Sequence, residues 1–138
     1  MAQNSEIVRG FYEALGRGDV ASALGMLDAR VEWNEAENFL YADKSPYIGP
    51  QAIVEGVFAR LGAEWDGFSA TPEQILDAGD TVVVLGRYRG IYKKTGIAVN
   101  AQLVHVFTVK AGKIVRFQQY TDTAQFRDAA GKGASAKA

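Results

Sequence analysis

Four β-rich runs in the second half of the chain constrain its fold more than any other feature. They lie near residues 67–77, 81–93, 97–110 and 113–122. The segments between them have turn compositions: Ala78-Gly79-Asp80, Lys94-Thr95-Gly96 and Ala111-Gly112. Short turns of this kind join antiparallel neighbours, because parallel strands need a much longer connection. The sequence therefore predicts an antiparallel meander.

Three helices are predicted before this meander. Apolar side chains recur at helical spacing between Ile7 and Leu15, and Ser5 can cap this first helix. Asp19 can cap a second helix. Gly49-Pro50 opens a third, with proline in its first turn.

Helices followed by a meander indicate the α+β class. We expect a cone-shaped α+β barrel, in which the three N-terminal helices pack in one strongly curved antiparallel or mixed sheet. At 138 residues the chain is long enough to bury the core of one domain, and no linker divides it. We therefore assign residues 1–130 to a single domain and residues 131–138 to a flexible C-terminal tail.

The composition excludes several classes of function. Acidic and basic residues are mixed along the chain and the formal net charge is −1, so nucleic acid is not an expected partner. The chain has no cysteine and one histidine, which excludes thiol catalysis and multi-histidine metal centres. It contains neither a long apolar run nor a basic-then-apolar leader, so we expect no membrane association and a cytoplasmic location. No cofactor is implied.

His105 stands in an apolar strand, with Leu103 and Phe107 on the same predicted face. A polar ring on that face needs a hydrogen-bond partner. The imidazole can contact a ligand or act as a general base, since its ordinary pKa lies near neutral pH. The alternative is a buried neutral ring that is bonded to Gln119 across the hairpin or to a tyrosine hydroxyl.

Several stretches together resemble a known family: Val8 to Asp19, Val31-Glu32-Trp33, Tyr47 to Ile53, and His105 through Asp122. Their order and spacing are similar to those of the SnoaL-like branch of the nuclear-transport-factor-two-like superfamily. This superfamily includes ketosteroid isomerases, epoxide hydrolases, polyketide cyclases, and binding or assembly domains without chemistry. The resemblance implies the cone-shaped fold, a small-molecule pocket in the cone and a homodimer. It does not by itself assign a function.

The resemblance also implies that the reactive groups of the family's enzymes are replaced here. The phenolic donor of the isomerases corresponds to Phe11, with Tyr12 beside it. Their catalytic carboxylate falls near Trp33 and their protonated acid near His105. The acid/base carboxylate of the cyclases corresponds to Gln119, whose amide cannot abstract a proton.

The Arg-x-Asp pair of the epoxide hydrolases corresponds to Arg87-Tyr88-Arg89, again without the carboxylate. Alternation would place Arg87 and Arg89 on the face of Val83 and Leu85. If that face is concave, the planar fork of Arg87 can bind a ligand carboxylate. The alternative is that both arginines are solvated or pair with a surface acid such as Glu73 or Asp77.

The acids expected near the mouth of the cone all lie between Trp33 and Tyr41. Glu35 and Glu37 lie beside aromatic residues there, and partial burial would raise the pKa of either carboxyl and suit it to act as a general base. An exposed acid on a rim loop is the alternative. Asp122 precedes a short helical segment, and this position favours a helix cap over a catalytic acid.

The expected pocket has aromatic walls and a few polar groups. His105 and Glu35 are the candidate catalytic residues. The residues expected to contact a ligand are Tyr12, Trp33, Tyr41, Tyr47, Phe58, Arg87, Phe117 and Gln119.

We therefore expect a pocket protein that binds a small hydrophobic molecule bearing a carbonyl or a carboxylate. One alternative is an isomerase- or cyclase-type enzyme that moves a proton next to a carbonyl, with His105 or Glu35 as base. Gln119 or Arg87 would then support the oxyanion. Another alternative is a non-catalytic dimeric assembly domain. The convex sheet face is the expected dimer interface, through Val104, Val106, Tyr88 and Tyr120.

Overall fold

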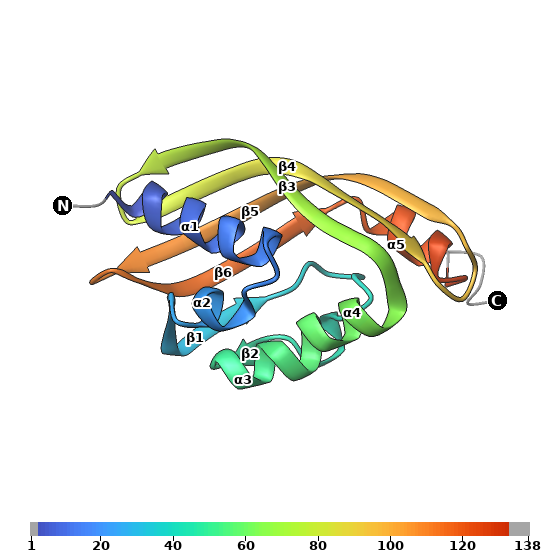
Figure 1. Cartoon of the computed structure of the whole chain (residues 1–138). Helices are drawn as coiled ribbons and strands as arrows, with labels where there is room; N and C mark the ends of the chain where they lie inside the picture. Colours follow the sequence, from blue (N-terminus) through green and yellow to red (C-terminus); the bar gives the residue numbers. More distant parts are fainter. Residues whose placement is uncertain (1–2, 133–138) are drawn as a thin grey trace.

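The computed structural model describes residues 3–132 (Figure 1). Its α-helices are α1 (Asn4–Gly16), α2 (Val20–Leu24), α3 (Pro50–Ile53), α4 (Ala59–Glu64) and α5 (Thr123–Ala129). A 3-10 turn, η1 (Ala42–Lys44), and a π-helical segment, η2 (Val54–Phe58), complete the helical part. The strands are β1 (Leu27–Asn34), β2 (Tyr47–Ile48), β3 (Trp65–Ala78), β4 (Thr81–Tyr92), β5 (Ala98–Lys110) and β6 (Lys113–Thr121). Most of the predicted tail, residues 133–138, lies outside the described residues.

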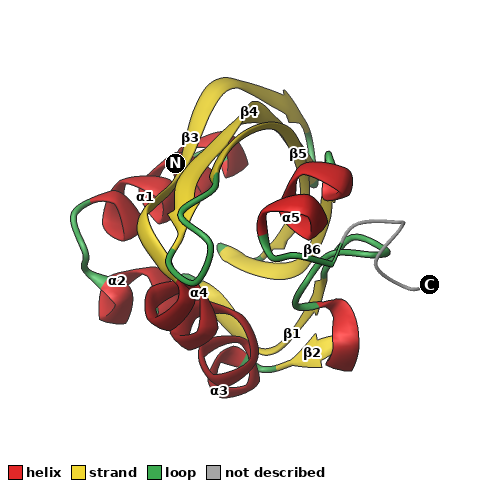
Figure 2. Ribbon diagram, turned by 90° about the vertical axis from the view of Figure 1, so that its right-hand side faces the viewer, coloured by secondary structure: helices red, strands yellow, loops and turns green. Residues whose placement is uncertain are grey.

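The strands of the described chain form one mixed sheet in the order β2-β1-β6-β5-β4-β3. The meander from β3 to β6 is antiparallel throughout, while β1 pairs in parallel with β6. Figure 2 shows this sheet curling over the helices, with α1 and α4 along its open side, and Figure 1 shows α5 at one end of the sheet. The α+β class and the curved mixed sheet predicted from the sequence are confirmed.

Irregular pairing between β3 and β4 bends the sheet. The register shifts between Asp66 and Ser69 and again between Pro72 and Gln74, and such bulges increase the local bend and twist of a strand. Gly86 on β4 makes the second bend possible, because a Cβ there would lie 2.2 Å from the Thr71 carbonyl oxygen. A glycine in a strand often marks such a close approach of two backbones.

Helix boundaries follow the predicted caps in part. The Asp19 side chain accepts a hydrogen bond from the Ser22 backbone N–H at 3.1 Å, which confirms it as the cap of α2. The prediction for Ser5 was wrong, since α1 begins at Asn4 and Gln3 is its N-cap. The Ser5 N–H instead donates to the carboxylate of Asp77, at 3.2 Å.

The third predicted helix is one continuous helical run from Pro50 to Glu64, with η2 in its middle. Gly56 lies in η2, where a Cβ would stand 2.1 Å from the ring of Tyr47. The helical run therefore passes close over the Tyr47 ring. From Val54 to Phe58 its turns are the wider ones of a π-helix.

The core consists of two clusters of buried side chains. The larger lies between α1 and the sheet, and the smaller lies under α5 around Phe126. Alternation along β5 is as predicted: Leu103, His105 and Phe107 are buried, while Val104 and Val106 are half-buried on the other face.

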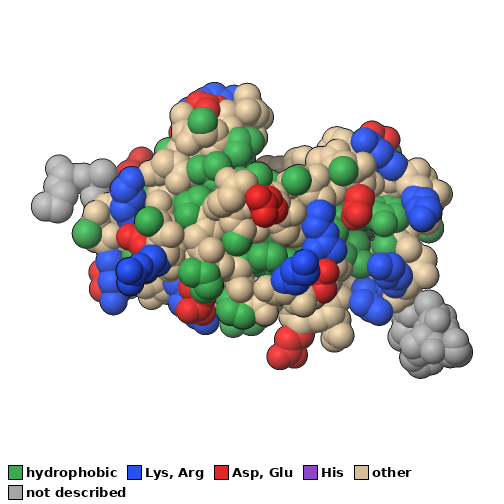
Figure 3. Space-filling model, turned by 90° about the horizontal axis from the view of Figure 1, so that it is seen from below, with side chains coloured by type: hydrophobic (Ala, Val, Ile, Leu, Met, Phe, Trp, Pro, Cys, Tyr) green, Lys and Arg blue, Asp and Glu red, His purple; other side chains and the backbone are tan. Residues whose placement is uncertain are grey.

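The surface shows no concentration of one charge on the face that carries α3 and α4. Figure 3 shows basic and acidic side chains interspersed there among apolar ones. Within residues 3–132, no helix combines the length and the apolar character needed to cross a membrane.

Candidate functional site

A cavity of about 580 Å³ lies between the helices and the concave face of the sheet. Seven of the residues predicted from the sequence line it: Tyr12, Trp33, Glu35, Phe58, His105, Phe117 and Gln119. They come from α1, β1, the segment after β1, η2, β5 and β6. The fold thus brings together residues that are far apart in the sequence.

Three predicted residues do not line the cavity. Arg87 lies on the opposite face of β4, where its guanidinium donates to the side chain of Asn100 at 2.7 Å. Tyr41 and Tyr47 are buried in the segment below α4, and the Tyr47 hydroxyl donates to the Tyr41 carbonyl oxygen at 2.7 Å. The structure therefore places neither the carboxylate fork expected at Arg87 nor the ligand contacts expected at Tyr41 and Tyr47 in this cavity.

Aromatic rings form the cavity wall beside the Glu35 carboxylate. Trp33 is stacked on Phe117, with ring centroids 3.7 Å apart and an interplanar angle of 17°. Phe58 meets Trp33 edge to face, with centroids 5.7 Å apart. Such packing fixes the direction of the indole N–H.

Glu35 is the buried acid of the cavity, with 7% of the residue exposed. Its Oε2 accepts a hydrogen bond from Trp33 Nε1 at 2.9 Å. Its Oε1 is buried without a hydrogen-bond partner among residues 3–132. Burial raises the pKa of Glu35 to about 8, although the Trp33 hydrogen bond and the charge of Arg60 oppose this rise.

His105 has a tyrosine hydroxyl at each ring nitrogen. Tyr12 from α1 meets Nδ1, and Tyr88 from β4 meets Nε2 at 2.5 Å. Burial lowers the pKa of His105 to about 3, so its imidazole is neutral near pH 7. Of the two interpretations of this residue, the buried neutral ring bonded to a tyrosine hydroxyl is the one the structure supports.

Gln119 joins this chain of hydrogen bonds to the backbone beside Glu35. Its Oε1 accepts from the Ala36 N–H at 2.9 Å, and its Nε2 donates to the Tyr88 hydroxyl at 2.8 Å. Because a backbone N–H can only donate, the amide orientation is fixed. Gln119 faces His105 across the β5–β6 ladder, but it reaches His105 only through Tyr88.

Tyr88 is the cavity residue that the sequence interpretation placed wrongly. It was expected on the convex face, but it is 5% exposed and lines the cavity. Val82 and Val84 face the core, so the even-numbered positions of β4 point inward. Burial raises the pKa of the Tyr88 hydroxyl and the nearby charge of Glu35 raises it further, so Tyr88 remains protonated.

The Tyr12–His105–Tyr88 chain leaves one phenolic hydrogen unused. A neutral imidazole has one N–H and one acceptor nitrogen. One tyrosine therefore donates to His105 and the other accepts from it. The tyrosine that accepts keeps its own hydrogen, and both tyrosines line the cavity.

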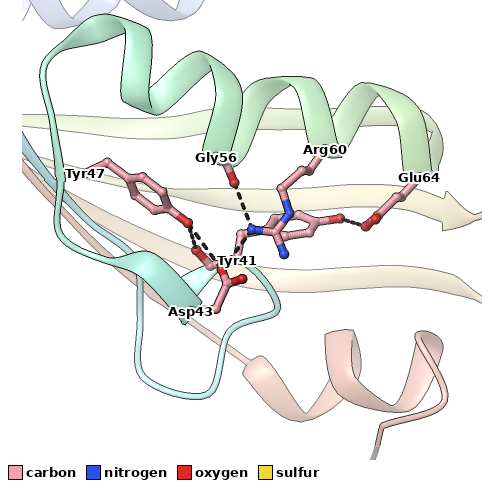
Figure 4. A network of polar contacts seen from close by, with 6 residues as sticks. All are labelled: Tyr41, Asp43, Tyr47, Gly56, Arg60 and Glu64. Atoms are coloured by element: carbon pink, nitrogen blue, oxygen red, sulfur yellow. Dashed lines mark hydrogen bonds and ion pairs between the residues drawn. The ribbon is translucent and has the colours of Figure 1, made fainter.

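A network of polar contacts anchors the segment after Glu35 to α4 (Figure 4). Arg60 forms an ion pair with Asp43 at 2.8 Å and stacks over the ring of Tyr41, 4.5 Å from its centroid. The Tyr41 hydroxyl donates to Glu64 and accepts from Trp65. These contacts hold the loop that positions the acid.

Two further positions complete the comparison with the sequence. Asp122 occupies the N-cap position of α5, but its side chain forms no hydrogen bond to the helix backbone. In the part of the chain that is described, no three His, Cys, Asp or Glu side chains are grouped as a metal site.

Comparison with known proteins gives consistent matches. The model of the family described as the SnoaL-like domain matches residues 8–117. An NTF2-like protein from Burkholderia thailandensis is 39% identical, with a TM-score of 0.88, and the match covers 94% of this chain and 98% of that one.

Two solved structures with bound molecules have lower identity. TerC, co-crystallized with polyporic acid, is 24% identical over 91% of this chain and 96% of TerC, with a TM-score of 0.81. A protein from Catenulispora acidiphila with a ketosteroid isomerase-like fold, in complex with trimethylamine, is 19% identical over 97% of this chain and 98% of that one, with a TM-score of 0.77. No curated protein gives a significant match.

Proposed function

This chain belongs to the SnoaL-like domain family, within the NTF2-like proteins, and on that premise we propose that its cavity binds a small apolar carbonyl compound. In this proposal Glu35 moves a proton at the carbon beside the carbonyl. The single observation that carries this proposal is Oε1 of Glu35, which is buried without a partner among residues 3–132 and belongs to an apolar cavity that is also lined by Tyr12 and Tyr88. A base and an oxyanion donor are the two groups that such a proton transfer needs.

The lining of the cavity narrows the ligand class. Its walls are largely aromatic and aliphatic, and none of the lining residues within the described chain is a lysine or an arginine. A carboxylate-bearing ligand would therefore lose its hydration without gaining a cation. A neutral carbonyl compound can accept a hydrogen bond from the phenol without burying an unpaired charge. Of the two ligand types expected from the sequence, we therefore propose the carbonyl type.

In the proposed reaction, ionised Glu35 takes a proton from the carbon next to the carbonyl. The electrons of the broken C–H bond form a C=C bond, and the carbonyl oxygen takes up the negative charge. Tyr12 or Tyr88 donates a hydrogen bond to that oxygen and keeps its own proton. Protonated Glu35 then returns the proton to the same carbon or to a neighbouring one, and the enzyme is unchanged.

His105 has a positioning role in this proposal rather than the role of a base. Both of its nitrogens are occupied by tyrosine hydroxyls. Its pKa of about 3 also makes the imidazole too weak a base to take up a proton near neutral pH. Glu35 is therefore the better candidate of the two catalytic groups expected from the sequence.

The test is the exchange of the α-hydrogens of 2-tetralone for deuterium in D2O, followed by proton NMR. Wild-type protein should exceed the buffer rate, and Glu35→Gln should lose about 100-fold or more of that acceleration. Glu37→Gln is the matched control, because Glu37 is exposed and only two residues away. Equal exchange by wild type and Glu35→Gln would exclude Glu35 as the base.

A second candidate is the binding of an alkylammonium ion. A buried acid among aromatic rings, with no lysine or arginine among the described lining residues, suits a cation through charge and cation–π contacts. The trimethylamine complex of the Catenulispora acidiphila protein adds support at the level of the fold. Since Glu35 must ionise to pair with a cation, tetramethylammonium should release close to one proton at pH 7, measured by calorimetry in two buffers. A neutral ketone should release none.

We also propose that two copies of the chain pair through the convex sheet face. Outward-facing apolar side chains are aligned across its ladders, with Val104 opposite Tyr120 and Val83 opposite Val106. Tyr120 is 55% exposed, which is costly for a large ring with no cover. Light scattering should give a dimer mass for wild type and a monomer mass for Val106→Glu. A dimer in both would exclude this face.

A further inference from the structure

We propose that His105 is a tautomer switch, which decides whether Tyr12 or Tyr88 donates the hydrogen bond to an oxygen of the bound ligand. This inference rests on the proposed cavity ligand, but it does not require Glu35 to act as a base. It assigns to the histidine the selection of one donor from two.

The geometry places the switch between two elements. Tyr12 approaches Nδ1 from α1 and Tyr88 approaches Nε2 from β4, so the imidazole is the only link between the two hydroxyls in these contacts. All three side chains are at most 8% exposed. Each hydrogen must therefore be shared within this chain of contacts or with whatever occupies the cavity that the tyrosines line.

Each tautomer presents a different donor. When Nδ1 carries the proton, it donates to Tyr12, and Tyr88 donates to Nε2. The hydrogen of Tyr12 is then available to a ligand. When Nε2 carries the proton, it donates to Tyr88, and Tyr12 donates to Nδ1. The hydrogen of Tyr88 is then available. The site thus offers one strong donor at a time, and it favours ligands with a single acceptor oxygen.

Gln119 makes the two states unequal. Its Nε2 already donates to the Tyr88 oxygen. In the state with Nε2 protonated, that oxygen accepts two hydrogen bonds while it donates outward. Hydrogen bonds of this kind polarise one another, so Tyr88 becomes the stronger donor. A ligand oxygen that gains negative charge should therefore select the tautomer protonated on Nε2.

The chain has one histidine, so ¹⁵N NMR of histidine-labelled protein reports the switch without assignment. In Tyr12→Phe, the proton should reside on Nε2, where Tyr88 still accepts it, because a buried N–H without a partner is costly. In Tyr88→Phe, the proton should reside on Nδ1. Both variants keep the ring. Tyr92→Phe, at a tyrosine that does not line this cavity, should leave the wild-type spectrum unchanged.

A neutral probe with one carbonyl oxygen, 2-acetylnaphthalene, completes the test in wild-type protein. Binding should shift the nitrogen signals toward one tautomer, and that tautomer identifies the donor: Tyr88 for a proton on Nε2, and Tyr12 for a proton on Nδ1. Phenylalanine at the donor should weaken binding about 10- to 100-fold, and phenylalanine at the other tyrosine should weaken it less than about 3-fold. One tautomer in both variants would overturn the proposal, whether or not the probe binds. An imidazolium in the complex, or equal losses in both variants, would also overturn it.

These results separate the two proposals. The tautomers of the ligand-free variants do not depend on Glu35. Failure of Glu35→Gln to slow deuterium exchange would therefore leave the switch intact, and a single fixed tautomer would leave the base intact.

Discussion

The indole nitrogen of Trp33 donates a hydrogen bond to Oε2 of Glu35, two residues further along the chain, at 2.9 Å. An indole N–H can only donate, so this contact stabilises the ionised carboxylate. The stacking of Trp33 on Phe117 holds the donor in place. The same contact leaves Oε1 as the carboxylate oxygen that has no hydrogen-bond partner among residues 3–132.

Replacing Trp33 by phenylalanine should raise the pKa of Glu35 further above 8. A hydrogen bond to a charged group contributes about 1.5–3 kcal/mol, which corresponds to about 1–2 pKa units. Carboxyl ¹³C shifts of glutamate-labelled protein, followed against pH, measure the change. Phe58→Leu alters the same wall without removing a donor to Glu35, so its effect should be small. A lower pKa in Trp33→Phe would contradict this reading of the contact.

Burial of Glu35 should make folding stability depend on pH. The pKa of Glu35 is near 8 in the folded protein and 4.5 ordinarily, so its favourable contribution is complete below pH 4.5 and is lost as pH rises to 8. Glu35→Gln should be free of this loss, and relative to wild type it should gain about 3–5 kcal/mol between pH 4 and pH 9. Urea unfolding of both proteins at pH 4, 7 and 9 measures the gain. Parallel stability curves would refute the burial argument.

The parts of this protein that the sequence predicts well are those set by local rules. The turns of the meander can be recognised from their glycine and polar residues. His105 is correctly placed inward, because Leu103 and Phe107 flank it with period two and half-exposed residues alternate with them. Asp19 caps its helix through a contact three residues away.

Positions on β4 are harder to predict, because Val82, Val83, Val84 and Leu85 form an unbroken apolar run. Such a run contains no alternation to tell the two faces apart. Only pairing across the sheet, with Val84 opposite His105, sets which residues point inward. An error of one position exchanges the faces, which is why Arg87 was expected inside and Tyr88 outside.

The hydroxyl of Tyr41 should contribute more to stability than a tyrosine hydroxyl that forms no hydrogen bond. It accepts a hydrogen bond from the indole N–H of Trp65 at 3.0 Å. Tyr41→Phe leaves this buried donor without its partner, so it should cost about 1–3 kcal/mol in the free energy of unfolding. Tyr92→Phe, at a half-buried tyrosine whose hydroxyl has no hydrogen-bond partner among residues 3–132, should change stability by less than about 0.5 kcal/mol. Equal effects in chemical denaturation would show that the network of Figure 4 adds nothing.

Two glycines of the helical run from Pro50 to Glu64 should respond in opposite directions to replacement by alanine. At Gly62 a Cβ meets nothing within 4 Å, so Gly62→Ala should stabilise the protein by about 0.5–1 kcal/mol through helix propensity. At Gly56 the Cβ would stand 2.1 Å from a ring carbon of Tyr47. That ring cannot easily withdraw, because its hydroxyl is bonded to the Tyr41 carbonyl oxygen. Gly56→Ala should therefore destabilise the protein by about 1–3 kcal/mol despite the same gain in propensity. Thermal unfolding of the two variants beside wild type decides the matter, since a shift in the same direction for both would show that Tyr47 is free to move away from the helix.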